Sequence, residues 1–148
     1  MTKWATYDDS TWPVVHVSMK GTIKNDNDFL DFVNDWLGFY NRPGNFTFIF
    51  DTSDVGFVNI KYAFRMSKFI KELKEKISQQ KCNTLSRSFI VHNSFYVKIL
   101  LKLIFFMEDP VAPVYILPKD QEYKIYQKIA AFKENANSTK TERLVQSL

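Results

Sequence analysis

Polar side chains able to do chemistry follow the predicted strands at their carboxyl ends. Three such groups follow the apolar runs at 46–50, 88–91 and 113–117. The first two contain carboxylates, hydroxyls and an imidazole, and the third is Lys119 and Asp120. Groups of this kind serve in general acid–base catalysis and in metal binding. Because ligands of an open parallel sheet bind beyond the carboxyl ends of its strands, these groups could converge there on one ligand pocket. The candidate pocket residues are Asp51, Ser53, Asp54, His92, Asn93 and Ser94.

No recognised catalytic motif accompanies these side chains. Gly56 stands alone, and the sequence contains neither a phosphate-binding G-x-x-x-x-G-K-[ST] loop nor a nucleophile elbow. Aspartate, serine and asparagine also cap helices and form turns, which is the commoner reason for finding them at strand ends. We therefore expect a non-catalytic protein with no catalytic residue, no metal site and no cofactor. An enzyme that uses Asp51, Ser53 and His92 is the third alternative.

The phenylalanine-rich strand at 46–50 is the element around which the other predicted elements are arranged. Polar residues follow it abruptly, as is typical of a buried parallel strand that leads into a turn and a helix. Asn25 or Asp26 is expected to cap the helix before this strand, and Asn59 the helix after it. The expected strands are 4–7, 12–19, 46–50, 88–91 and 113–117, with a turn at 8–10, and the expected helices are 26–40, 59–79, 95–108 and 120–132.

This order, β-β-α-β-α-β-α-β-α, predicts a single α/β domain. Each helix between strands is long enough for a right-handed crossover, so the later strands form a mostly parallel sheet. The N-terminal strand joins as an antiparallel hairpin, which gives a mixed sheet of five strands. We assign residues 1–133 to this domain and 134–148 to a polar C-terminal tail.

The helix at 95–108 carries more apolar residues than one buried face requires. The expected core stripe is Ile99, Leu100, Leu103 and Met107. A second apolar set extends around the helix and leaves Lys98 and Lys102 on a narrow polar strip. This second set is Val97, Leu101, Ile104, Phe105 and Phe106. So much apolar area needs a cover, and the alternatives are the last helix of the same chain, a second copy, another protein or a lipid.

Composition limits the classes of partner. A net charge of +4 permits attraction to acidic surfaces. The lysines of the helix at 59–79 lie on a solvated face without exposed aromatic residues, so we expect no nucleic-acid binding. The single cysteine, Cys82, excludes an internal disulfide and fits a reducing compartment. Since neither a secretory signal nor an apolar stretch long enough to cross a membrane is present, we expect a soluble cytoplasmic protein without a transmembrane segment.

The hairpin ending in Gly21, the first helix and the stretch Phe48-Ile49-Phe50-Asp51 followed by 53–58 resemble the STAS family over about residues 12–132. This is the fold of bacterial anti-sigma-factor antagonists and of the cytoplasmic tails of sulfate transporters. In the family, an aspartate and a phosphorylated serine open the following helix. Asn59 and Ile60 stand at the matching positions here, so the resemblance implies the scaffold without the phosphorylation switch. It also implies a protein-docking surface around Asn59, Ile60 and Lys61.

The stretch 88–98, the apolar helix that follows it and the strand at 114–117 resemble the second half of CRAL-TRIO domains. That family includes lipid-binding proteins and small-GTPase regulators. The sequence therefore predicts a non-catalytic interaction module that docks a protein partner or forms a homodimer through its helices. The alternative is a small domain that binds a lipid or another ligand.

Overall fold

The computed structural model of the chain describes residues 3–80, 83–134 and 144–147, so Cys82 lies outside the described residues. The strands are β1 (Ala5–Thr11), β2 (Val14–Gly21), β3 (Phe46–Val55), β4 (Leu85–His92), β5 (Val114–Pro118) and β6 (Val145–Ser147). The helices are α1 (Asp26–Gly38), α2 (Lys61–Gln80), α3 (Phe95–Met107) and α4 (Lys124–Glu134), with short 3-10 turns at Phe39–Asn41 and Lys119–Gln121.

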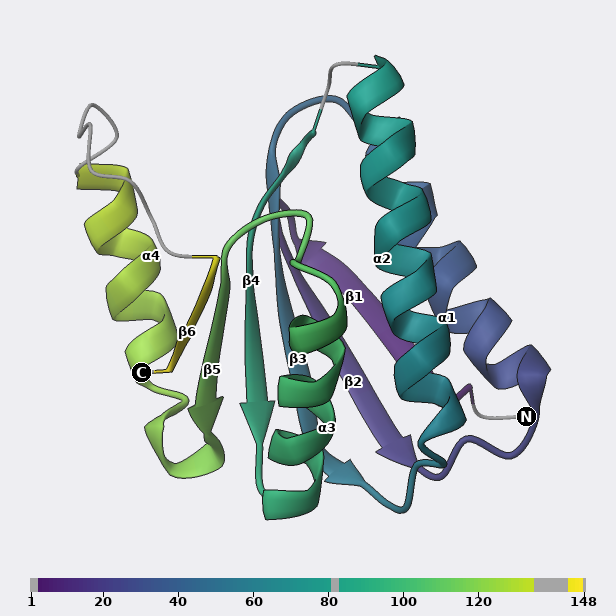
Figure 1. Cartoon of the computed structure of the whole chain (residues 1–148). Helices are drawn as coiled ribbons and strands as arrows, with labels where there is room; N and C mark the ends of the chain where they lie inside the picture. Colours follow the sequence, from purple (N-terminus) through teal and green to yellow (C-terminus); the bar gives the residue numbers. More distant parts are fainter. Residues whose placement is uncertain (1–2, 81–82, 135–143, 148) are drawn as a thin grey trace.

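The strands form one sheet in the order β1-β2-β3-β4-β5-β6 (Figure 1). β1 is antiparallel to β2, and every other neighbouring pair is parallel. The predicted α/β class and the mostly parallel sheet are confirmed. The described part of the chain has six strands where five were predicted, because Val145 and Gln146, in the segment expected to be a polar tail, pair with Val114 and Tyr115 of β5.

Alternation along the strands divides the sheet into two covered faces. Phe48 and Phe50 of β3 belong to the core beneath α1, α2 and α3, whereas Ile49 between them belongs to a second cluster beneath α4. Since successive strand residues point to opposite faces, α4 lies on the side of the sheet opposite to the other three helices. This second cluster contains Ile125 of α4 and Leu117 of β5.

The position of α4 gives the last connection an unusual hand. The crossovers through α1, α2 and α3 all return on one face while the strands advance in one direction across the sheet. β6 continues the same advance, but α4 covers the other face, so the β5–α4–β6 connection has the opposite, left hand. Parallel crossovers are right-handed in about 98% of cases.

Aromatic rings fill the core under the three-helix face. Trp36 of α1 lies over Phe48 and Phe50, with ring centroids 5.1 and 5.3 Å away, and these two phenylalanines are 5.0 Å apart. Aromatic pairs in such geometry contribute about 0.5–1.5 kcal/mol beyond the area they bury. The rings on alternate positions of β3 therefore explain why α1 docks at this place on the sheet.

Two local predictions were wrong. The first hairpin turns at Trp12 and Pro13, not at 8–10; β1 continues past Asp8 through a register shift, and Asp8 Oδ1 accepts a hydrogen bond from Ser10 N (2.9 Å). The turn-forming residues there make an irregularity inside a strand. β3 runs on to Val55, well beyond the predicted end at 50, because β2 pairs with it as far as the Gly21–Val55 register.

Candidate functional site

Asp51 and Ser53 lie within β3, on the face of the sheet that α4 covers. Asp51 Oδ1 accepts hydrogen bonds from Ser53 N (2.9 Å) and Ser53 Oγ (2.5 Å). Asp51 Oδ2 accepts one from Lys119 Nζ (3.0 Å), and Lys119 also pairs with Glu122 (2.6 Å). Partial burial alone would raise the pKa of Asp51, but the hydrogen bonds from Ser53 and Lys119 outweigh it and lower that pKa. Asp51 is thus a fully partnered carboxylate that fixes the start of the segment leading to α4.

His92 lies on the other face of the sheet. Asp51 is in register with Val91 of β4, so the side chain of His92, the next residue, points to the opposite side, under α3. His92 is buried, and this burial, together with the charge of Lys98, lowers its pKa. Asp51 and His92 therefore point to opposite faces of the sheet.

The other predicted pocket residues have structural or solvent-facing positions. Ser94 is the N-cap of α3, since its hydroxyl oxygen accepts hydrogen bonds from Tyr96 N (3.2 Å) and Val97 N (3.5 Å). Asp54 and Asn93 are exposed. The six residues are thus divided between two faces and the solvent. Among the residues that the structure describes, no cluster of three or more His, Cys, Asp or Glu side chains has the geometry for a metal ion.

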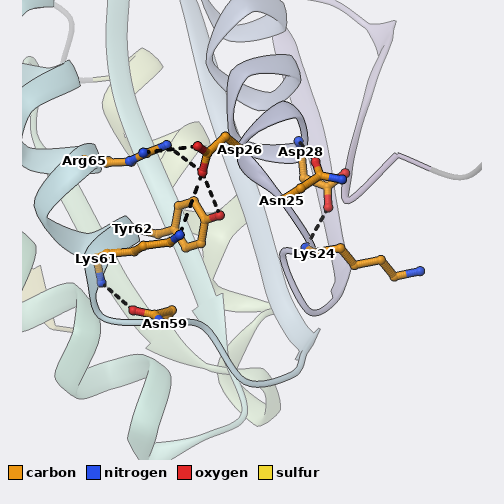
Figure 2. A network of polar contacts seen from close by, with 8 residues as sticks. All are labelled: Lys24, Asn25, Asp26, Asp28, Asn59, Lys61, Tyr62 and Arg65. Carbon is orange, nitrogen blue, oxygen red and sulfur yellow. Dashed lines mark hydrogen bonds and ion pairs between the residues drawn. The ribbon is translucent and has the colours of Figure 1, made fainter.

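A polar network joins the starts of α1 and α2 (Figure 2). Asp26, the first residue of α1, accepts hydrogen bonds from Tyr62 Oη (3.2 Å) and Arg65 Nη2 (3.3 Å), pairs with Arg65 Nη1 (2.8 Å), and lies 3.9 Å from Lys61 Nζ. Desolvation would raise the pKa of Asp26, but hydrogen bonds from Arg65 and Tyr62 and the nearby positive charges lower it. Because these ion pairs are exposed to solvent, the network orients the two helices more than it stabilises them.

Capping residues define where these two helices begin. The side chain of Asn25 accepts a hydrogen bond from Asp28 N (3.1 Å), and Asn59 Oδ1 accepts one from Lys61 N (3.0 Å), as the sequence predicts. Ile60, between Asn59 and α2, is exposed. The segment expected to dock a partner therefore consists of a cap, an exposed isoleucine and a lysine that faces Asp26.

The buried face of α3 is rotated relative to the predicted one. Ile99, expected in the core, is about half exposed, whereas Val97 is buried beside Leu100. Three further residues of the predicted interaction surface, Leu101, Ile104 and Phe105, are partly buried and pack against the core under α1, α2 and α3. Of the predicted α3 surface set, Phe106 remains as an exposed side chain, with 88% of its area accessible.

Seven exposed apolar residues lie on α2, on α3 and on the segment between β3 and α2. Phe95 and Phe57 are 75% and 65% exposed. Phe57 stacks on Tyr96, with ring centroids 5.9 Å apart and planes within 11°, and Tyr96 Oη donates a hydrogen bond to Val58 O. We call these residues the aromatic surface: Phe57, Ile60, Phe64, Phe95, Tyr96, Ile99 and Phe106.

The two helices that carry most of the aromatic surface are basic. α2 has six Lys or Arg and two Glu, and α3 has two Lys and no acidic residue, so these two helices together carry a net charge of +6. The net charge of the whole chain is +4, and the remainder is therefore −2. The mild overall charge hides a clear asymmetry between the α2–α3 side of the molecule and the rest.

Comparison with known proteins identifies no relative: no family model, curated protein or solved structure matches the chain. Among the described helices, none combines the length and the apolar character needed to cross a membrane.

Proposed function

We propose that the chain is a non-catalytic protein-interaction module whose aromatic surface docks a partner that is apolar at its centre and acidic at its rim. The observation that carries this proposal is the group of exposed aromatic and aliphatic side chains on the outside of α2 and α3. Single exposed apolar residues are normal on a soluble domain, but gathered ones mark a binding site. The division of the strand-end polar groups between two faces supports a role without catalysis.

The aromatic surface is partly ordered before any partner binds. Stacking against Phe57 and the hydrogen bond to Val58 O fix the ring of Tyr96. Anchors that are already held lose less conformational entropy on association, and aromatic residues dominate the energetics of most protein interfaces. Tyr96 and Phe57 are therefore suited to be anchors of the interface, together with Phe95 and Phe106 near the two ends of α3.

Charge decides between a second copy of this chain and a different protein. A homodimer through this surface would bring two α2–α3 layers against one another, each still basic although Lys61 and Arg65 pair with Asp26 and Lys74 pairs with Glu108. Like charges facing each other across an interface cost several kcal/mol, whereas opposite charges speed association and fix orientation. We therefore favour an acidic partner over self-association. A STAS-like scaffold without the phosphoacceptor serine, with Ile60 at that position, is part of this proposal and is supported by the sequential strand order.

The experiment uses two designed amphipathic peptides with the same apolar residues and with either Glu or Lys at all flanking positions. We expect the Glu peptide to bind the whole chain and the Lys peptide not to, with an affinity that falls as salt is added. The double variant Phe95→Ser with Phe106→Ser should abolish binding. Leu30→Ser, which replaces an exposed leucine of α1, is the matched control and should bind as the wild type does.

Three outcomes contradict the proposal. Equal binding of both peptides would remove the role of charge. A stable dimer in sedimentation that Phe95→Ser with Phe106→Ser dissociates would show that a second copy occupies the surface. Binding to phosphatidylserine vesicles that is tighter than binding to the Glu peptide, and that is lost in the same double variant, would make the occupant an anionic membrane.

A further inference from the structure

An apolar cavity of about 140 Å³ lies between the sheet and the inner faces of α1, α2 and α3. α1 contributes Phe32 and Trp36 to its walls, α2 contributes Ala63 and Ile70, and Ala112 lies on the wall just before β5. Neither the strand-end candidate residues nor the residues of the aromatic surface line the cavity. The cavity and the aromatic surface share the helices α2 and α3 but use different side chains of them.

The cavity walls present no polar surface to which a water molecule could hydrogen-bond. They present only apolar surface, and the hydroxyls of Thr52 and Tyr62 among them have hydrogen-bond partners within the chain. Thr52 Oγ1 donates a hydrogen bond to Val91 O (2.7 Å), and the hydroxyl of Tyr62 is bonded to Asp26. A buried water needs roughly two to four polar partners, and apolar cavities of this kind stay dry. Hydrocarbon is therefore the chemistry that this space accepts.

The volume fits one small ring. Native cores contain few voids larger than a water molecule, so a space of about 140 Å³ is an exception. An engineered cavity of about 150 Å³, lined by leucine, isoleucine and phenylalanine in another protein, stays dry and binds benzene. A lipid with two acyl chains is far too large for such a space.

α3 forms one wall, through the residues expected from the sequence to face a partner. Val97, Leu101, Ile104 and Phe105 all line the cavity. Leu101, Ile104 and Phe105 are partly exposed, so the cavity extends to within one side chain of the solvent beside α3. A ligand can thus reach the cavity by small movements of side chains on one helix.

We propose that this cavity is a binding site for one small apolar molecule, of the size of a single aromatic ring or a short alkyl chain. The site does not depend on the docking function, because its walls and the aromatic surface are different residues. Since the surface that the walls present is apolar, a hydroxyl on the ligand would enter unpaired. The site therefore prefers hydrocarbon to a polar ligand of the same shape.

The test is a titration of the isotope-labelled chain with benzene and with phenol, followed by amide and methyl NMR. We expect saturable benzene shifts at residues on the cavity walls and at least tenfold weaker binding of phenol. Ala63→Leu and Ala112→Leu each add a branched hydrocarbon group to the cavity and should each weaken benzene binding at least tenfold. Leu30→Ala on the surface of α1 is the control and should not change it.

Benzene shifts that do not saturate in the wild-type chain would overturn the proposal. So would benzene binding that is unchanged in folded Ala63→Leu and Ala112→Leu, because the ligand would then lie elsewhere. If either Ala63→Leu or Ala112→Leu does not fold, the other variant still tests the site. The comparison of benzene with phenol in the wild-type chain is a further test, because equal binding of the two ligands would exclude a dry apolar site.

Discussion

Truncation of Leu100 to alanine tests whether α3 covers a true void. Leu100 is buried on the inner face of α3 and lines the cavity of about 140 Å³. The matched control is Leu117→Ala in β5, because Leu117 is fully buried beneath α4 and does not line that cavity. Both substitutions remove the same hydrocarbon, so a difference between them reports on packing.

The two costs can be worked from burial and space. Loss of about three methylene-sized groups at about 0.8 kcal/mol each gives about 2.4 kcal/mol for either leucine. Around Leu117, the removed side chain leaves a new cavity, which costs about 24 cal/mol per Å³ and brings the total to about 4–5 kcal/mol. Leu100 already borders empty space and makes fewer contacts on that side, and α3 can settle toward the sheet when it is truncated. We therefore expect about 2.5 kcal/mol for Leu100→Ala.

The measurement is urea unfolding of both variants and of the wild-type chain, followed by tryptophan fluorescence and circular dichroism. Equal slopes would allow the midpoints to be read as differences in the free energy of unfolding. The reasoning is refuted if Leu100→Ala costs as much as Leu117→Ala or more, because the region beneath α3 would then be as closely packed as the region beneath α4.

Two further predictions concern single side chains. Burial and the charge of Lys98 hold the pKa of His92 below its ordinary value of 6.5, so the unfolded chain binds the proton more tightly than the folded one. The free energy of unfolding should therefore be highest above pH 6.5 and should fall as the pH drops below that value. Melting curves between pH 5 and 8 should show a smaller decline for His92→Gln than for the wild type, and an equal decline would contradict the shift. Ser94→Ala removes the cap of α3 and should cost about 1 kcal/mol in urea unfolding, with most of the loss restored in Ser94→Asp.

The elements that could be predicted are those with a strong apolar period. The stripe of α1, with Phe29, Phe32 and Trp36 all buried, follows directly from spacings of three and four residues. The same holds for the phenylalanines of β3, whose alternation fixes the face that meets α1. Such periods predict which residues form an element and which side is buried, and this was enough for the α/β class and the mostly parallel sheet.

β6 could not be predicted for a topological reason. It has only the three residues Val145–Ser147, too few for a period, and it follows a connection of the rarer hand. A reader of the sequence who expects right-handed crossovers has no reason to return the chain to the sheet after α4. Its pairing with β5 depends on tertiary contacts and not on a local signal.

The candidate pocket failed to assemble because of a single step in register. Whether Asp51 and His92 share a face depends on whether Asp51 lies opposite Val91 or opposite His92, and a shift of one residue reverses the answer. β3 also continues through Ser53 where a turn is expected, and the register of β3 with β2 shifts between Asp51 and Asp54. Sequence alone gives the residue types near the edge of a sheet. It does not give the register between strands, which decides whether two side chains point to the same face.

The rotation of α3 was hidden by its composition. Because the helix is apolar nearly all round, its hydrophobic pattern does not favour one buried face, and Ile99 was placed inside where Val97 lies. A signal was present all the same: Phe95, Ile99, Lys102 and Phe106 follow one another at spacings of four, three and four, the period of a single helical stripe. That stripe contains the exposed residues.

α3 thus has two apolar faces with two different environments. Val97, Leu101 and Ile104 face inward and line a cavity without polar groups, while Phe95 and Phe106 face solvent beside a basic helix. A helix that only covered the sheet would need the inward apolar face and would have no use for exposed phenylalanines. A helix that only bound a partner would be expected to pack closely against the sheet, without a cavity between them. Because the two sets of residues do not overlap, substitutions at Phe95 and Phe106 should leave benzene binding intact, and the filled variants should leave peptide binding intact. Each proposal can therefore fail without the other.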